Sequence, residues 1–423
     1  MFGFGILKKA SASRGERHRL VGVDLSASRA RAVAAGSGRT RALVLDGNNH
    51  DLPMFVALDG RTPVVGLAGH ALYRKAPHSI CSNFLPMLCK PQEWKGPRLT
   101  VTPESATLAA LQKLVAPITA ETDAAGLTLP TYLDATQIKK LTELTATAKL
   151  PIRGTVSGPL AVAAHRSSFV LAPVPEADSD SGDDLNSRPT LLPLHTPEAG
   201  SGAVLVIDAD EFALTASLVL VTPNAVTLHA TAAWRRTSLR VWQDRLIDAL
   251  ADRCVRVCRR DPRDSADGEQ ALFEQLEDAM EAARLGRPVR VTMRGGHWHQ
   301  DLVLQPEEWE ACTAAILRTT IEDLGQFLHG TTSALPMPPR AVWLSHAAGR
   351  LPGLAVQMYK HAPPRATVSI LPANAYAEAA ASLLPRWLVG GLPHGHLDDT
   401  IPLERVHTDS ESFAGSLPLR ERG

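Results

Sequence analysis

Two aspartates stand at the ends of apolar runs that lie about half a chain apart. Asp24 ends the apolar run within 20–28, Asp208 ends the run that begins at Ala203, and a turn follows each of them. An aspartate at the end of a strand either forms the turn through its own side chain or offers its carboxylate to a ligand. Because the arrangement occurs twice, the pair is a candidate site, and both interpretations stay open.

Glu281 and Arg284 are a second candidate pair. They lie three residues apart on a predicted helix, and side chains at this spacing face each other. On an exposed helix face such a pair is an ion pair in water with little energetic consequence. The alternative is that both side chains contact a ligand.

Histidines and cysteines offer weaker candidates. His297 and His299 would lie on one face of a strand, but no third ligand follows nearby, so a hairpin turn with two surface histidines is preferred over a metal site. Cys254 and Cys258 lie four residues apart in a helical stretch without a second pair at zinc spacing. The interpretation is that they are free, reduced thiols.

The composition limits the class of protein. The 423 residues carry a formal net charge of +0, with 44% hydrophobic and 21% charged residues, as in a soluble globular protein. A balanced charge excludes nucleic acid as the main partner. No apolar run reaches the roughly 18 residues of a membrane span, and the first twenty residues are too polar for a signal peptide. We therefore expect a cytoplasmic protein without membrane contact.

Strand and helix signals alternate along the whole chain, which predicts α/β layers. In the first half, strands are expected at 19–34, 40–45, 54–58 and 126–129, and helices after 64–69, from Thr102, from Asp134 to 149, and at 158–164. In the second half, strands are expected at 212–221, 225–232, 289–293, 301–304, 341–344 and 368–371, and helices at 239–259, 269–285, 306–329, 354–361 and 375–384. Residues 176–184 are acidic without a large apolar side chain, which predicts a flexible insertion.

Several segments resemble the motifs of one family, and they occur in the same order. Residues 21–25 resemble I-G-I-D-L-G-T-T, 127–133 resemble I-T-V-P-A-Y-F, 158–163 resemble E-P-T-A-A-A, 206–208 stand where V-F-D-L-G-G-G-T is expected, 341–352 resemble V-L-V-G-G-S-T-R-I-P, and 372–381 resemble P-D-E-A-V-A-Y-G-A-A. Over residues 20–385 the chain thus resembles the nucleotide-binding domain of the heat shock protein 70 (DnaK-type) family.

The resemblance implies an α/β, bilobal, actin-like ATPase fold with duplicated ribonuclease-H-like subdomains. The implied organisation is a basic tail at 1–19, lobe I at 20–173, an acidic flexible insertion at 174–202, lobe II at 203–385, and a linker-like C-terminal tail at 386–423. That tail is too short for the family's client-binding domain, so a protein partner or co-chaperone is expected.

The resemblance also implies a site for ATP or ADP with Mg²⁺ between the lobes. Asp24 and Asp208 match the aspartates that organise water and, through water, magnesium, which makes them the implied catalytic and metal residues. The implied nucleotide contacts are Ser26 and Ser28 in the first phosphate turn, and Glu281, Arg284, Gly349 and Arg350 on the adenosine side. Arg350 precedes Leu351-Pro352 and has the alternative role of marking a helix start.

The phosphate turns depart from the family pattern. Ser26-Ala27-Ser28 replaces G-T-T, and Asp210-Glu211-Phe212-Ala213 replaces G-G-G-T, which places two carboxylates where the phosphates of the nucleotide should lie. At ~4 Å and an effective dielectric constant near 20, each like-charge pair opposes binding by about 4 kcal/mol. The family's catalytic lysine falls between Met87 and Cys89, and its metal-shell glutamate falls at Gly158, so neither is matched.

Two functions follow from this pattern. The first is a chaperone-related domain that binds ATP or ADP between its lobes, with hydrolysis weak or lost, because phosphoryl transfer depends on aimed cations. The alternative is a degenerate, non-catalytic family member, a pseudo-ATPase that acts as a protein-interaction or regulatory module. Whether the chain is an enzyme is left open by the sequence.

Overall fold

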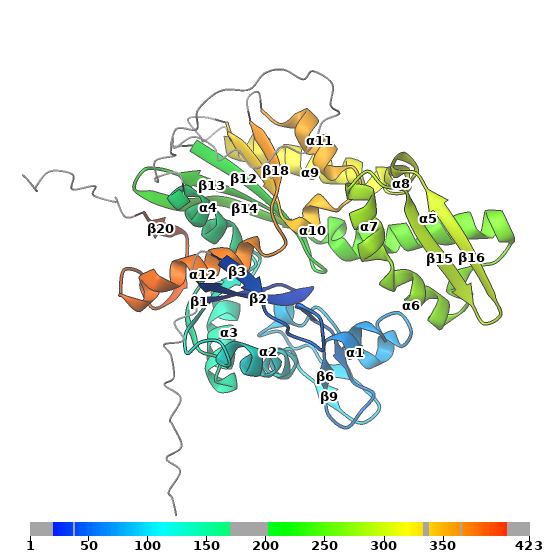
Figure 1. The fold of residues 1–423 in the computed structure, drawn as a ribbon, viewed down its shortest axis with the longest axis horizontal. Coiled ribbons are helices and arrows are strands. Elements are labelled where there is room, and N and C mark those ends of the chain that lie inside the picture. Colours follow the sequence, from blue (N-terminus) through cyan, green and yellow to red (C-terminus); the bar gives the residue numbers. More distant parts are fainter. Residues whose placement is uncertain (1–19, 37–38, 170–201, 333–337, 364–365, 404–423) are drawn as a thin grey trace, which may run out of the picture.

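Strands and helices alternate along the chain and build a mixed α/β structure, as the sequence predicts (Figure 1). The computed structural model describes residues 20–36, 39–169, 202–332, 338–363 and 366–403. The expected basic tail at 1–19, all but the last residue of the expected acidic insertion at 174–202, and residues 404–423 lie outside the described residues.

The N-terminal sheet has the strand order β19-β11-β10-β1-β2-β3, with β4 paired to β2. Strands β1 to β3 are antiparallel neighbours, whereas β1, β10, β11 and β19 run parallel. The strands are β1 (Leu20–Leu25), β2 (Arg29–Gly36), β3 (Arg39–Ala42), β4 (Asp51–Pro53), β10 (Ala125–Leu129), β11 (Ile152–Ser157) and β19 (Gly395–Leu397).

The C-terminal sheet repeats this topology in the order β18-β17-β12-β13-β14-β20. Again three antiparallel strands, β12 to β14, are followed by two strands, β17 and β18, that run parallel to β12. The strands are β12 (Gly202–Ala209), β13 (Leu214–Val221), β14 (Ala225–Trp234), β17 (Ala341–Leu344), β18 (Thr367–Ile370) and β20 (Thr400–Pro402). The two halves of the chain therefore share one strand order and one set of pairing directions.

Two helices lie between the sheets and contact each other. Helix α12 (Ala375–Leu388) packs on β1, β2 and β10, while α4 (Gly158–Phe169) packs on β13 and β14 (Figure 1). Each half thus lends a helix to the sheet of the other half. The approach of α12 is close, since a Cβ atom on Gly22 would lie 1.8 Å from the carbonyl oxygen of Ala377, so only glycine fits there.

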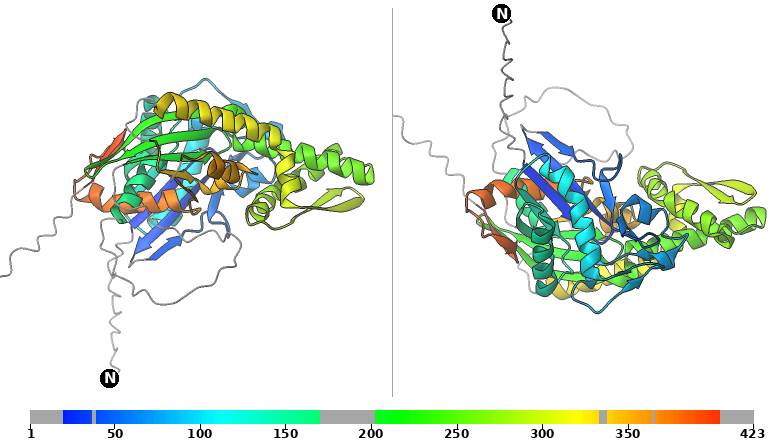
Figure 2. Two further views of the ribbon diagram at one scale, coloured as in Figure 1. Left: turned by 90° about the horizontal axis from the view of Figure 1, so that it is seen from above. Right: turned by 90° about the horizontal axis from the view of Figure 1, so that it is seen from below.

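The outer faces of the sheets carry four further helices. Helices α2 (Pro103–Thr119) and α3 (Ala135–Ala148) lie on the N-terminal side, and α9 (Ala314–Thr332) and α11 (Leu354–His361) lie on the C-terminal side (Figure 2). The predicted helix starts at Thr102 and Asp134 are confirmed, because both side chains close a capping box.

Two helices predicted as continuous are interrupted. The predicted 269–285 helix is split into α6 (Ala266–Glu274) and α7 (Leu276–Arg284), because the Gln275 side chain bonds to both backbone groups of Thr292. The predicted 306–329 helix is split at Thr313 into α8 (Pro306–Cys312) and α9. Local periodicity does not report such tertiary hydrogen bonds.

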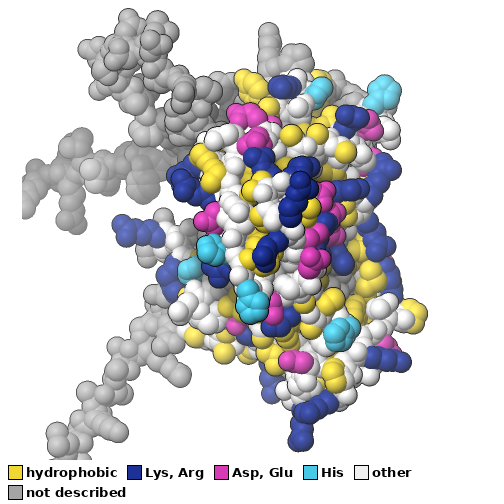
Figure 3. All heavy atoms as spheres, turned by 90° about the vertical axis from the view of Figure 1, so that its right-hand side faces the viewer, with side chains coloured by type: hydrophobic (Ala, Val, Ile, Leu, Met, Phe, Trp, Pro, Cys, Tyr) yellow, Lys and Arg dark blue, Asp and Glu magenta, His cyan; other side chains and the backbone are white. Residues whose placement is uncertain are grey.

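A hairpin and three helices form one end of the molecule. Strands β15 (Val289–Gly295) and β16 (Trp298–Leu304) pack their apolar face toward α5 (Leu239–Cys258) and α6, which confirms the predicted hairpin turn and leaves His297 and His299 exposed. Figure 3 shows cationic and anionic side chains intermingled at this end. Arg263, for example, pairs with carboxylates of α5 and its own loop.

The short elements complete the structure. They are β5 (Val56–Ala57), β6 (Val64–Val65), β7 (Ile80–Cys81), β8 (Trp94–Lys95), β9 (Thr100–Val101), α1 (Leu67–His70), α10 (His346–Gly349) and single 3-10 turns at Pro77–Ser79, Leu85–Met87, Arg235–Thr237 and Pro262–Asp264. Within the described ranges, none of the helices has the length and apolarity that crossing a bilayer requires.

The segment expected as a linker-like tail from residue 386 instead packs into both halves as far as it is described. Trp387 is fully buried, and a Cβ atom on Gly154 would lie 2.2 Å from its ring. Strand β19 then pairs with β11 of the N-terminal sheet, and β20 pairs with β14 of the C-terminal sheet. Leu397 and Ile401 are buried at these two sites. The family resemblance implied a linker here, but pairing with two strands that are distant in sequence gives this segment a defined structure.

A chain ending at His394 is expected to lose at least about 4 kcal/mol of unfolding free energy, because it lacks the buried Leu397 and Ile401 and two strand pairings. Urea denaturation would measure this loss against the full chain. A chain ending at Leu403 is the matched control and should keep the full stability. Equal stability of both truncated chains would contradict the role assigned to β19 and β20.

Candidate functional site

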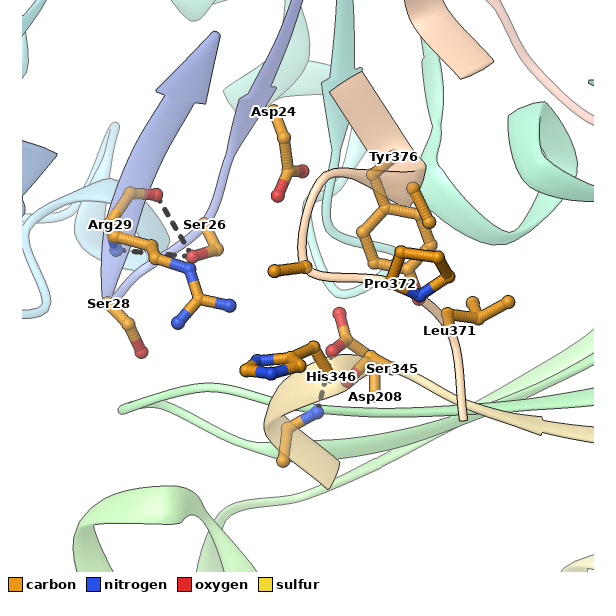
Figure 4. A pocket seen from close by; sticks show the side chains of 13 residues that line it. Asp24, Ser26, Ser28, Arg29, Asp208, Ser345, His346, Leu371, Pro372 and Tyr376 are labelled. Atoms are coloured by element: carbon orange, nitrogen blue, oxygen red, sulfur yellow. Dashed lines mark hydrogen bonds between the residues drawn. The ribbon is translucent and has the colours of Figure 1, made fainter. Parts of the chain in front are cut away.

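The two aspartates identified in the sequence line one small cavity between the sheets. Asp24 lies at the end of β1 and Asp208 near the end of β12, and they share the cavity with Arg29, His346 and Tyr376 (Figure 4). The cavity has a volume of about 20 Å³, which is room for roughly one water molecule. Small-molecule pockets are typically about 300–1,000 Å³, so the space between the aspartates is far too small for a triphosphate.

Both aspartates lie in surroundings that favour the neutral carboxyl. Burial, together with the nearby carboxylates of Asp210 and Asp24, raises the pKa of Asp208 to about 7, against a hydrogen bond from Ser345. Burial also raises the pKa of Asp24, opposed by the charge of Arg29 and by a hydrogen bond of 3.0 Å that Thr128 donates. Burial thus disfavours the charged form of both carboxyl groups.

The chain supplies its own cation at this position. Figure 4 shows the Arg29 side chain extending into the space between Ser28 and His346. Its Nε lies 3.8 Å from Asp51, and the carboxylates of Asp51, Glu277, Asp24 and Asp208 raise its pKa against the effect of burial. The guanidinium of Arg29 thus places a positive charge among these acidic groups.

Asp210 joins the two turns that follow β1 and β12. Its Oδ2 accepts hydrogen bonds from the backbone N–H of Ala27 (3.0 Å) and from the hydroxyl of Tyr132 (2.5 Å). Its Oδ1 accepts from the backbone N–H groups of Phe212 (2.9 Å) and Ala213 (3.0 Å). The carboxylate is 4% exposed and takes backbone donors of both turns at once. These are the kind of backbone donors that bind phosphate in glycine-rich turns.

The serines of the first turn are also engaged within the protein. Ser28 Oγ accepts a hydrogen bond of 2.7 Å from the backbone N–H of Glu211 in the second turn. Ser26 Oγ donates to the carbonyl oxygen of Arg29 and accepts from its N–H group, which closes a local turn. Both serines border the small cavity, but their hydrogen bonds hold protein groups.

The four residues predicted on the adenosine side lie close together at α7 and α10. Arg284 and Glu281 form an ion pair of 2.5 Å with each other, and His346 lies 3.9 Å from Glu281. Arg350 is 7% exposed and pairs with Glu277 at 3.5 Å. Gly349 is packed so tightly that a Cβ atom would lie 2.5 Å from Ile370. None of the four lines the cavity of the two aspartates.

Sequence reasoning missed Arg29, Glu277 and the bridging role of Asp210. The sequence did contain a signal for part of the role of Asp210, because an aspartate commonly accepts hydrogen bonds from the N–H groups two and three residues later. Its bonds to Ala27 and Tyr132, however, come from residues far away in the sequence. Arg29 and Glu277 carry no local pattern that separates them from surface charges.

The residues present do not fit a magnesium-nucleotide complex at the two turns. The backbone donors that would meet phosphate are taken by Asp210, and Arg29 lies beside the aspartates that would face the metal. Across the part of the chain that the structure describes, no group of three or more histidine, cysteine or acidic residues is arranged to hold a metal ion.

Comparison with known proteins adds no relative, since no family model and no curated protein matches the chain.

Glu211→Gln is expected to change how stability depends on pH. Burial raises the pKa of Glu211 to about 7 from 4.5. Between about pH 4.5 and about pH 7 the folded protein keeps the proton of Glu211, whereas the unfolded chain releases it. The protonated Glu211 therefore contributes fully to the unfolding free energy below about pH 4.5, and this contribution is lost as the pH rises through about 7. The glutamine side chain does not titrate in this pH range, so the variant lacks this pH dependence of stability.

Relative to the unmodified chain, the Glu211→Gln variant should therefore gain up to about 3 kcal/mol of unfolding free energy between about pH 5 and about pH 8.5. Urea denaturation at the two pH values measures this. Glu322→Gln, on the exposed face of α9, is the matched control and should show no pH-dependent difference. A difference for Glu211→Gln that is the same at both pH values would contradict the buried, protonated state.

Proposed function

We propose that the chain is a non-hydrolysing relative of the heat shock protein 70 nucleotide-binding domain that acts as a protein-interaction or regulatory module. The observation that carries the proposal is the position of Asp210, whose carboxylate occupies backbone donors of both turns. A carboxylate in this place does the electrostatic work of a bound phosphate group, so the two halves are held together without a ligand.

The repeated sheet topology supports the family and the bilobal, actin-like fold in this proposal. Both sheets have three antiparallel strands followed by two parallel strands, as expected for duplicated ribonuclease-H-like subdomains. The exchange of α4 and α12 between the sheets is consistent with such a duplication. Since one fold hosts many functions, the argument against catalysis rests on the site alone.

The charges at the site support the loss of hydrolysis. Phosphoryl transfer requires cations aimed at the transferred group and a positioned water molecule. Here Arg29 is held by Asp51 and by the acids around it, and the space between Asp24 and Asp208 takes about one water molecule. A triphosphate would have to displace the carboxylate of Asp210, which already accepts hydrogen bonds from the backbone donors of both turns.

Binding of ATP or ADP through the adenosine side is the second candidate function. The observation in its favour is that Glu281, with its ion-pair partner Arg284, lies beside His346 and Arg350, which are more than 60 residues away in the sequence. Burial lowers the pKa of His346 to about 4, so its ring is neutral at neutral pH and could stack on a base. In this case ADP binds without turnover.

Calorimetric titration with Mg-ATP and Mg-ADP, followed by a phosphate-release assay, tests both candidates. The first predicts no saturable heat and no phosphate release above that of the buffer. Saturable binding of ADP without turnover would select the second candidate. Phosphate release that scales with protein concentration, and that is lost in Asp208→Asn, would overturn the proposal of a non-hydrolysing protein.

Asp210→Gly tests whether the carboxylate stands in for an anion. Removing it frees the N–H groups of Ala27, Phe212 and Ala213, so pyrophosphate should raise the melting temperature of the variant by about 2 °C or more. The unmodified chain and the exposed control Asp59→Gly should not respond. An equal response in all three proteins would show that pyrophosphate acts elsewhere. If Asp210→Gly does not fold, Asp210→Ser serves in its place.

A further inference from the structure

Cys254 and Cys258 are a pair of thiols that neither candidate function uses. They lie one helical turn apart on α5, and their Sγ atoms are 3.5 Å from each other. Both are free cysteines, so each sulfur atom is available for a bond to a ligand. Figure 1 shows α5 extending to the outer end of the molecule. The pair is therefore a candidate site separate from the two turns.

The two thiols differ in their exposure to solvent. Cys254 is 0% exposed and belongs to the apolar stripe of α5 that packs into the core. Cys258 is half-buried and is the last residue of the helix, next to the exposed Val257. A buried thiol packs as a small apolar group, which explains Cys254 but not its contact with a second, half-exposed thiol. A ligand from solvent would meet Cys258 first, with Cys254 directly behind it.

The geometry of a helix favours a bridging ion between these thiols over a disulfide bond. Cβ atoms four residues apart on a helix are separated by about 5–6 Å, whereas a disulfide requires about 3.5–4.5 Å. Rotation about χ1 changes the distance between the sulfur atoms but does not bring the Cβ atoms together. A metal–sulfur bond is about 2.3 Å long, so one ion between two sulfur atoms spans up to about 4.6 Å. A small rotation from the present 3.5 Å reaches this span.

Two sulfur ligands select the kind of ion. A structural Zn²⁺ site has four protein ligands, and the described residues contain no cluster of three or more histidine, cysteine or acidic side chains that could hold an ion. Thiolates are soft ligands, and among the common metal ions they favour Cu⁺. Because Cu⁺ forms stable complexes with two thiolates alone, it does not need the ligands that Zn²⁺ requires.

The charges around the pair suit a bound thiolate complex. Residues 252–261 contain four arginines and two aspartates, which gives this segment a formal net charge of +2. Two thiolates with one Cu⁺ carry a net charge of −1, which the arginines stabilise against the negative end of the helix dipole. Burial raises the pKa of Cys254 to about 12, so without a metal its thiol keeps its proton and is a poor nucleophile. A soft cation competes with that proton for the same sulfur atom.

We propose that Cys254 and Cys258 together bind one soft, two-coordinate cation, Cu⁺. Binding forms two copper–sulfur bonds and releases both thiol protons to water, and neither copper nor sulfur changes its oxidation state. The ion thereby cross-links neighbouring turns at the end of α5. The proposal does not depend on the function proposed above, because it uses neither of the two turns. Nucleotide titration and copper titration can therefore fail or succeed separately.

Anaerobic titration of the reduced full chain with Cu⁺, in competition with the chromophoric chelator bicinchoninate, tests the proposal. One Cu⁺ per chain should move from the chelator to the protein, and X-ray absorption should show two sulfur neighbours. The apparent affinity should rise about hundredfold from pH 6 to pH 7, because two protons are released. A rise of about tenfold or less would indicate a single thiolate ligand and contradict the proposal. No transfer of Cu⁺ from the chelator would also overturn it.

Cysteine variants separate this site from the other thiols of the chain. Cys258→Ser changes a half-buried residue and should remain folded, and it should weaken Cu⁺ binding at least about hundredfold, because even the loss of an outer partner costs about 10–100-fold. Cys254→Ala removes the second ligand and should have the same effect. Cys89→Ser removes an exposed thiol of the N-terminal half and is the matched control, which should bind as the unmodified chain does. Unchanged affinity in Cys258→Ser, or lost affinity in Cys89→Ser, would place the ion elsewhere and overturn the proposal.

Discussion

The hydrogen bonds of the Asp210 carboxylate are the interaction on which the arrangement of the two halves depends. One oxygen holds Ala27 and Tyr132 of the N-terminal half, and the other holds Phe212 and Ala213 of its own turn. A buried acceptor with four hydrogen-bond donors is costly to remove, because each donor would be left without a partner. The Asp210 carboxylate brings the ends of β1 and β12 together and thereby keeps the cavity between Asp24 and Asp208 small.

The elements shared between the two halves keep Asp210 and Ala27 close to each other. Helices α4 and α12 are exchanged between the halves, and β19 and β20 add one strand to each sheet from a single short segment. These elements limit rotation of one sheet against the other, so Ala27 stays within hydrogen-bonding distance of Asp210. A ligand that opened the turns would work against all of these contacts together, because packed interfaces do not deform gradually.

The buried charges at the interface between the two halves pair with one another. Arg29, Arg31 and Arg350 meet Asp51 and Glu277, so that groups which would face ligands in an open cleft neutralise one another. Buried ion pairs contribute little net stability, but removing one partner is expensive. This balance of charges is consistent with the small volume of the cavity at Asp24 and Asp208.

The sequence alone determined the alternation of strands and helices, the helix caps at Thr102 and Asp134, and the pairing of Asp24 with Asp208, because each follows from local pattern or from repetition along the chain. Tertiary structure alone decided the rest. The direction of Asp210 depends on donors from a turn 183 residues away. The helix break at Gln275 depends on a hydrogen bond to β15, and the order of 395–402 depends on two sheets. Each of these features depends on hydrogen-bond partners that are distant in sequence, and local sequence patterns do not show which distant groups will become partners.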